Sequence, residues 1–197
     1  MASTACSSRC RWLAALLLWP VAAFADVPEP DDYWTGPINS EVPATIAGGA
    51  VIHAQELARL LRTEKAGRIQ PVIVDVSNAP VRPATMAPGA AWMPLPHDTI
   101  PGSSWLAGAG QGRITSEIEL LFASRLAQLS GGDLDRQIVI YCHERCWLSW
   151  NAARRAIRLG YRRVSWFPEG IEGWRAAGFK TSPVNSPDET SSPPSSR

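Results

Sequence analysis

Two short runs of consecutive apolar residues constrain the fold of this chain more than any other feature. Residues 71–76 read PVIVDV and residues 137–141 read QIVIY. A strand with one exposed face alternates apolar and polar residues, whereas a continuous apolar run is typical of a strand that is covered on both faces. A third run, VSWF at residues 164–167, has the same character. We therefore predict an α/β fold, with a mostly parallel central sheet and helices on both of its faces.

Segments in which apolar residues recur every three or four positions separate these strands, as expected of helices that pack on a sheet. The second of them begins at the capping-box pair Ser116 and Glu119 and stops at Gly131. We predict helices over residues 54–62, 116–130, 151–159 and 171–177. Ligands of such folds bind beyond the carboxyl ends of the strands.

The first 25 residues have the pattern of an export signal. Arg9 and Arg11 form a positive region, a nearly continuous apolar run covers residues 12–22, and AFA at residues 23–25 fits a cleavage site. The run is too short to cross a bilayer as a helix. We predict a signal peptide over residues 1–25, and a periplasmic product with no membrane anchor after cleavage.

The rest of the chain divides into one folded domain and two polar flanks. Residues 26–44 are rich in Pro and Asp and are predicted to form an irregular lead-in. Residues 182–197 are mostly Ser, Pro, Asp and Thr, and they bury too little apolar surface to offset the entropy of ordering, so we predict a disordered tail. The domain is predicted over residues 45–181. A formal net charge of +1 and the lack of a basic block argue against nucleic acid as a partner.

Cys142 directly follows the strand at residues 137–141 and is the predicted chemical centre. The free backbone N–H groups of a curled loop and of a helix start stabilise a thiolate, a persulfide or an oxyanion. We therefore predict that Cys142 is a nucleophile with a lowered pKa. The residues predicted to surround its substrate are those of the following loop, His143, Glu144, Arg145 and Trp147.

Cys146 comes one helical turn after Cys142, and the mature protein would keep only these two cysteines. In helical geometry that spacing puts the two Cα atoms about 6 Å apart, which a disulfide tolerates. The pair is compatible with a disulfide, a metal site or a reactive thiol with a helper. A structural zinc needs four ligands, and besides the loop only the distant His53 and His97 are on offer, so we assign no metal ligand. A softer metal with fewer ligands stays open.

Four segments, in this order along the chain, resemble the rhodanese-like family. They are VIVDV at residues 72–76, MAPGAAWMP at 86–94, IVIYC at 138–142 and EGIEGW at 169–174. They look like the family's strand ending in Asp-Val, its His-Ile-Pro-Gly-Ala stretch, the strand that delivers the active cysteine, and its closing Gly-Trp motif. The resemblance covers about residues 45–181. It implies a rhodanese-like fold and sulfurtransferase-like or thiol-redox chemistry.

The loop departs from the Cys-x-x-Gly-x-Arg pattern that working sulfurtransferases of this family usually have. Arg145 stands at the Gly position, and Trp147 stands at the Arg position. Without that arginine, bound thiosulfate loses a bidentate clamp. We therefore expect little thiosulfate sulfurtransferase activity.

The segment Cys142-x-x-x-Cys146-Trp147, followed by SWNAA, is similar to an exported rhodanese-like family with a Cys…Cys-Trp motif. That family is associated with bacterial alcohol catabolism that depends on pyrroloquinoline quinone (PQQ). The resemblance implies that the partners are a PQQ-dependent alcohol dehydrogenase system or the associated alcohol transport components. It also implies a role in handling a redox cofactor.

Three functions remain open at this point. In the first, Cys142 carries a persulfide or a mixed disulfide, and Cys146 resolves it. In the second, the two thiols, with or without His143, bind a metal or a redox cofactor for a periplasmic quinoprotein pathway. In the third, the fold is an inert interaction surface and the cysteines are locked in a disulfide. We favour the first, with a metal or cofactor module as the alternative.

Overall fold

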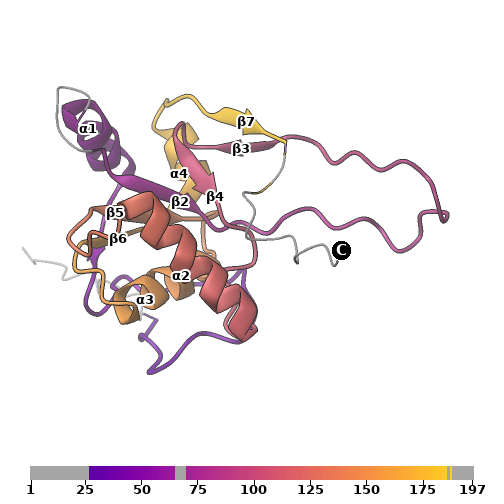
Figure 1. Ribbon diagram of the computed structural model, residues 1–197. Helices are drawn as coiled ribbons and strands as arrows, with labels where there is room; N and C mark the ends of the chain where they lie inside the picture. Colours follow the sequence, from indigo (N-terminus) through magenta and orange to yellow (C-terminus); the bar gives the residue numbers. More distant parts are fainter. Residues whose placement is uncertain (1–26, 65–69, 186, 188–197) are drawn as a thin grey trace, which may run out of the picture.

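Five parallel strands form the central sheet of the computed structural model, which describes residues 27–64, 70–185 and 187 (Figure 1). Their order across the sheet is β1-β6-β5-β2-β4. The strands are β1 (Ala50–Val51), β2 (Val72–Asp75), β4 (Ser103–Trp105), β5 (Ile138–Tyr141) and β6 (Val164–Phe167). The predicted α/β fold with a parallel sheet is therefore confirmed. The predicted signal peptide, residues 1–25, lies outside the described residues.

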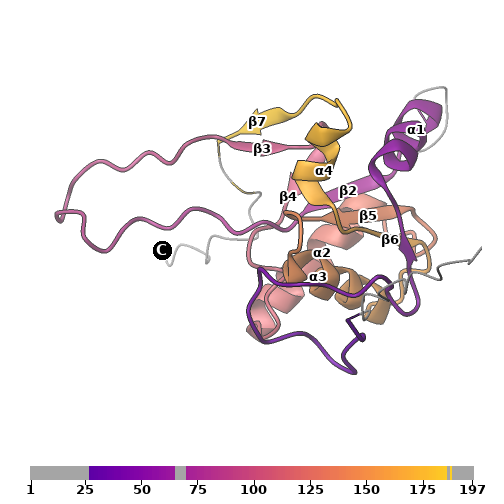
Figure 2. The ribbon, with the colours of Figure 1, turned by 180° about the vertical axis from the view of Figure 1, so that it is seen from behind.

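Helices cover both faces of this sheet, as Figures 1 and 2 show. The helices are α1 (Ala54–Glu64), α2 (Ser116–Ser130), α3 (Trp147–Arg158) and α4 (Gly170–Ala176). Val74 and Ile140 belong to the core that α2 and α3 cover, whereas Ile73 and Val139 belong to the core on the side of α1 and α4. Successive strand residues point to opposite faces, so the continuous apolar runs supply both cores. Within the described residues, no helix has the length and apolar character needed to span a membrane.

Two helix starts differ from the predictions. Thr115 caps α2, because its side-chain oxygen accepts the N–H of Ile118, and Ser116 is already helical. The predicted capping box of Ser116 and Glu119 is therefore not formed, because the residue three positions after the N-cap is Ile118. Helix α3 begins at Trp147 and not at residue 151, since Cys146 occupies its N-cap position. The large aromatics that open α3 pack into the core, where a helical turn presents them better than a loop would.

A small two-stranded sheet lies beside the main one and corrects the prediction for the tail. Strand β3 (His97–Thr99) pairs antiparallel with β7 (Ser182–Val184). The disordered tail predicted from residue 182 is thus wrong for these three residues, because β3 offers them the backbone partners that their polar composition did not reveal. Residues 186 and 188–197 lie outside the described part.

The lead-in segment, of which residues 27–44 are described, packs along the first turns of α3. The ring of Trp34 stacks on that of Trp147 with 4.4 Å between the centroids. The fully buried Asn151 accepts the backbone N–H of Trp34 at 2.8 Å and donates to its carbonyl at 3.0 Å. Trp34 and other lead-in residues pack against the core, so the folded unit starts before residue 45.

Residues 86–94, which resemble the family's His-Ile-Pro-Gly-Ala stretch, lie in a loop between β2 and β3 that projects from the body (Figures 1 and 2). A second Pro-Gly, in the IPG of residues 100–102, immediately precedes the edge strand β4.

Candidate functional site

Cys142 and Cys146 lie at the two ends of a short loop that joins β5 to α3. Both are free thiols, and their exposed fractions are 0% and 2%. The structure brings the two predicted catalytic residues together, and their thiols hydrogen-bond to each other. A thiol pair that is both buried and hydrogen-bonded can hold one proton between two sulfurs.

The two thiols have opposite pKa shifts. The hydrogen bond from Cys142, helped by the backbone N–H of Leu148, lowers the pKa of Cys146 to about 7. The same hydrogen bond and burial raise the pKa of Cys142 well above its ordinary value. The prediction that Cys142 has the lowered pKa is therefore wrong. Cys146 is the N-cap residue of α3, so its sulfur lies at the positive end of the helix dipole, although its side chain makes no capping hydrogen bond.

Ser77, which the sequence analysis did not consider, supports Cys142. Its hydroxyl donates to Cys142 Sγ at 3.6 Å. Its carbonyl oxygen accepts the indole N–H of Trp105 at 2.7 Å, and its own N–H donates to Asp75 Oδ1 at 2.9 Å. These backbone contacts fix the hydroxyl of Ser77 against the sulfur.

Asp75 ends β2 as a fully buried carboxylate. His97 Nε2 lies 2.9 Å from Asp75 Oδ2, and the Tyr141 hydroxyl hydrogen-bonds to the same carboxyl. The imidazole of His97 stacks on Trp105, with 4.1 Å between the ring centroids. His97 was predicted to be remote from the site. The sequence did contain a signal for this pair. Asp75 ends an otherwise apolar strand, and a buried carboxylate needs a polar or charged partner.

A second imidazole–carboxylate pair lies on the outer side of the loop. His143 Nδ1 is 2.8 Å from Glu172 Oε1, and the backbone N–H of Glu144 donates to Glu172 Oε2 at 2.9 Å. Burial alone would raise the pKa of Glu172, but these hydrogen bonds outweigh it and hold the pKa below its ordinary value. The rings of His97 and His143 meet edge to face at 6.4 Å, so the two pairs are neighbours.

The four loop residues predicted to surround a substrate do not behave alike. The side chains of His143, Glu144 and Arg145 are at least half exposed. Trp147 is fully buried under the lead-in segment and belongs to the core. The prediction that Trp147 borders a substrate is therefore wrong, because its indole N–H is used by Ser40 and Glu41.

Arg145 adopts the left-handed backbone conformation, with φ of 53°. This is the position at which the related loops usually carry glycine, and it is the one described non-glycine residue with positive φ. Its guanidinium lies 3.2 Å from Glu41 across an exposed ion pair. The loop thus carries a side chain at a position whose left-handed backbone favours glycine.

The lead-in segment covers the Cys146 end of the loop. Asn39 forms an antiparallel bridge with Cys146. The N–H of Trp147 donates to Ile38 O at 2.9 Å, and the N–H of Ser40 donates to Arg145 O at 3.1 Å. These bonds close the loop from one side, so only a small reagent or a local opening gives access to the thiols.

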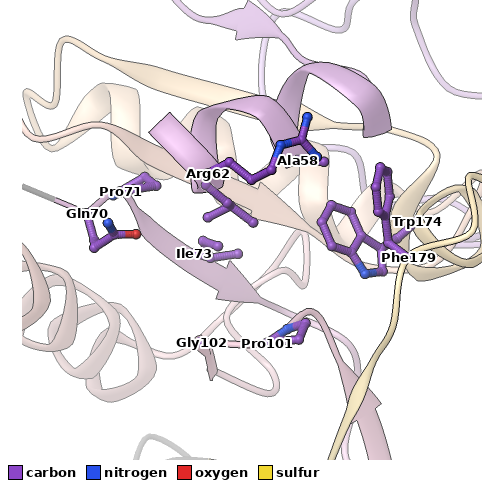
Figure 3. A pocket seen from close by; sticks show the side chains of 10 residues that line it. Ala58, Arg62, Gln70, Pro71, Ile73, Pro101, Gly102, Trp174 and Phe179 are labelled. Atoms are coloured by element: carbon purple, nitrogen blue, oxygen red, sulfur yellow. The ribbon is translucent and has the colours of Figure 1, made fainter. Parts of the chain in front are cut away.

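A cavity of about 520 Å³ lies at the opposite end of the sheet (Figure 3). Its walls are mostly apolar and include Ile73, Trp174 and Phe179, with Arg62 and Gln70 as polar members. Gln70 and Pro71 precede β2, so the cavity is at the amino-terminal ends of the strands, whereas Cys142 follows a carboxyl end. The cavity is separate from the thiol site. Among the described residues, no group of three or more His, Cys, Asp or Glu side chains is arranged to hold a metal ion.

Comparisons with known proteins give one family match and a set of similar solved structures. The model of the rhodanese-like domain family matches residues 53–177. No curated protein matches the chain at a significant level. Solved structures that resemble it include a thiosulfate sulfurtransferase from Pseudomonas aeruginosa, with 19% identity, a TM-score of 0.43 and coverage of 71% of this chain and 21% of that chain.

Two further solved structures are similar. One is an uncharacterized protein from Saccharomyces cerevisiae, with 16% identity, a TM-score of 0.40 and coverage of 66% of this chain and 92% of that one. The other is a probable thiosulfate sulfurtransferase, with 22% identity, a TM-score of 0.38 and coverage of 72% and 51%. The chain thus spans about a fifth of the first of these relatives and half of the last.

Proposed function

Because the chain belongs to the rhodanese-like domain family, we propose that it is an exported paired-thiol protein whose Cys142 and Cys146 alternate between the dithiol and the disulfide. The observation that carries the proposal is the buried hydrogen bond between the two thiols, with the lower pKa at Cys146. A thiolate and a thiol in contact are the reactant state of an internal disulfide.

The reaction begins at Cys146. Its thiolate attacks a small disulfide RSSR, the S–S bond of RSSR breaks, and Cys146 forms a mixed disulfide while RS⁻ leaves. Cys142 then attacks Cys146 Sγ, its proton passes to a released thiolate, and a second RS⁻ leaves. The sum is RSSR plus one thiol and one thiolate giving the internal disulfide, RSH and RS⁻. The protein is oxidised and RSSR is reduced.

The same pair supports sulfur transfer from a persulfide donor. Cys146 thiolate takes the outer sulfur of RSSH and releases RS⁻, and Cys142 thiol then displaces that sulfur as H₂S while the internal disulfide forms. Thiosulfate is a poor donor here, because Trp147 occupies the position of the anion-binding arginine and is buried. We infer a donor that is small and that does not need a guanidinium clamp.

The proposed setting is the periplasm, alongside PQQ-dependent alcohol oxidation and its dehydrogenase or transport components. This assignment rests on the resemblance of the Cys142-x-x-x-Cys146-Trp147 segment and on the predicted signal peptide. The alternative is a module that binds a soft metal or a redox cofactor between the two thiols. That module would use the same two sulfur atoms. One experiment that reads the state of both sulfurs therefore separates it from redox cycling.

That experiment is intact-mass spectrometry of the full chain expressed with its own N-terminus and purified from periplasm without reductant. The paired-thiol proposal predicts a loss of two protons or a gain of sulfur, both reversed by reductant. In Cys142→Ser a mixed disulfide should accumulate on Cys146, and Cys146→Ser should accumulate much less. A mass that keeps a metal through native spectrometry supports the alternative. Two unmodified thiols after exposure to oxidised glutathione, with no metal or cofactor bound, contradict both.

A further inference from the structure

A chain of three contacts connects an imidazole to the sulfur of Cys142. His97 pairs with Asp75, Asp75 accepts the N–H of Ser77, and Ser77 donates its hydroxyl to Cys142 Sγ. These contacts connect β3, the end of β2 and Ser77, which lies at the start of the projecting loop. His97 itself does not take part in the reaction steps described above.

Asp75, the central residue of these contacts, carries a buried negative charge. The neighbouring thiol pair must also carry a negative charge when it forms a thiolate. The Asp75 side chain is 0% exposed, and an uncompensated carboxylate is strongly unfavourable in such surroundings. The reactive form of the thiol pair adds a thiolate. Two like charges in a low-dielectric interior oppose each other, so an ionised Asp75 without a cation would disfavour the thiolate.

We propose that His97 is a positioning residue of the thiol site, whose protonated imidazole neutralises Asp75 and thereby permits a thiolate on the Cys142–Cys146 pair. This inference rests on the proposed function and adds the residue that controls it. The side chain of His97 is 14% exposed, so its ring keeps an edge toward solvent through which a proton can be exchanged. Stacking on Trp105 holds the ring in place.

The other ionisable groups around the site are compensated without His97. On α4 and the loop, Glu172 pairs with His143, and on the lead-in, Glu41 pairs with Arg145. On β3 and α4, Asp98 pairs with Arg175. Glu144 is exposed, and burial followed by the charge of Asp75 raises the pKa of Tyr141, which keeps that hydroxyl neutral. Among the described residues, Asp75 is thus the buried carboxylate whose cation is His97 alone.

The test measures the ultraviolet absorbance of the thiolate against pH in the reduced full chain, since this signal does not need a reagent to enter the site. The baseline is the Cys142→Ser/Cys146→Ser double variant. We expect His97→Gln to move the thiolate midpoint upward by about one pH unit, which is about tenfold less thiolate at a pH below the midpoint. His53→Gln is the matched control, because His53 also pairs with a carboxylate, Glu169, on the surface.

Rescue separates charge from packing. If His97 acts by neutralising Asp75, adding Asp75→Asn to His97→Gln returns the midpoint to that of the wild type. The amide oxygen introduced by Asp75→Asn can still accept the N–H of Ser77, so the variant keeps the backbone contact. A midpoint that does not move in His97→Gln, or that stays displaced in the double variant, overturns the inference. Far-ultraviolet circular dichroism confirms that each variant is folded.

The proposed function fails in a different way. It is contradicted if the wild type shows no thiolate near neutral pH and forms no internal disulfide. If the wild type does both and His97→Gln behaves identically, the thiol pair stands and only the role of His97 is lost.

Discussion

Gly170 lies against the backbone of Cys142, close enough that a Cβ atom there would collide with the Cys142 carbonyl oxygen and lie 2.5 Å from the carbonyl carbon of His143. The N–H of Ile171 donates to the same Cys142 oxygen at 3.0 Å. Helix α4 therefore begins in direct backbone contact with the thiol loop, and its Glu172 side chain adds hydrogen bonds to His143 and Glu144.

Replacing Gly170 with alanine should destabilise the protein by about 3 kcal/mol, because φ of 56° and the collision both oppose a side chain. Urea unfolding measures the loss. Gly178→Ala is the control, since Gly178 has φ of 83° but nothing within 4 Å of its Cβ position, and it should cost only about 1 kcal/mol. Equal losses in the two variants would contradict the close contact.

Replacing Arg145 with glycine should stabilise the loop by about 1 kcal/mol, because the left-handed conformation is unfavourable for any residue with a Cβ. The lost ion pair with Glu41 is exposed and contributes little. The melting temperature of the reduced protein is the readout. Glu144→Gly, one position earlier and without positive φ, should be neutral or destabilising, and a gain there equal to that of Arg145→Gly would refute the argument.

Replacing Asn151 with alanine should release the lead-in segment from α3. The amide bonds both backbone groups of Trp34 and the carbonyl of Gly110 at 3.1 Å, so its removal leaves buried polar groups unsatisfied at a cost of about 2 kcal/mol. Proteolysis within residues 27–44 and alkylation of Cys146 should both become faster. Asn78→Ala, which removes an exposed hydrogen bond to Gln111, should change neither.

The stability of the reduced protein should peak near pH 9. The pKa of Cys146 is lowered from 9.0 to about 7, so its contribution is complete above pH 9 and is lost as the pH falls through 7, by up to about 3 kcal/mol. The raised pKa of Cys142 acts in the opposite sense, and its contribution is lost as the pH rises above 9. Urea unfolding with reductant present should show this maximum, and the double serine variant should lack it.

The parallel sheet could be predicted because β2, β5 and β6 are continuous apolar runs, and the placement of Cys142 followed from the end of β5. The start of α3 could not be predicted. Trp147 and Trp150 are both buried, so this segment lacks the alternation of apolar and polar positions that distinguishes a helical turn from a loop. The same ambiguity hid the position of Cys146 as N-cap, so the lowered pKa was expected at Cys142 instead of Cys146.

The partners of Cys142 depend on contacts that are distant along the chain. Ser77 and His97 are 65 and 45 positions away from it, and neither lies in a motif that the sequence analysis used. Strand β7 escaped prediction for a similar reason, because its pairing partner β3 is short and polar. Pairings of this kind are set by the closed tertiary structure and leave little local pattern.

Equilibration with glutathione shows whether Cys142 and Cys146 form a reversible pair of thiols. The full chain is incubated across a series of ratios of reduced to oxidised glutathione, quenched with acid, alkylated and weighed by mass spectrometry. We expect one cooperative transition from two alkylated thiols to none, with little glutathione adduct in the wild type and a stable adduct on Cys146 in Cys142→Ser. Two thiols that remain alkylated at every ratio, or a stable adduct in the wild type without an internal disulfide, would contradict a reversible pair.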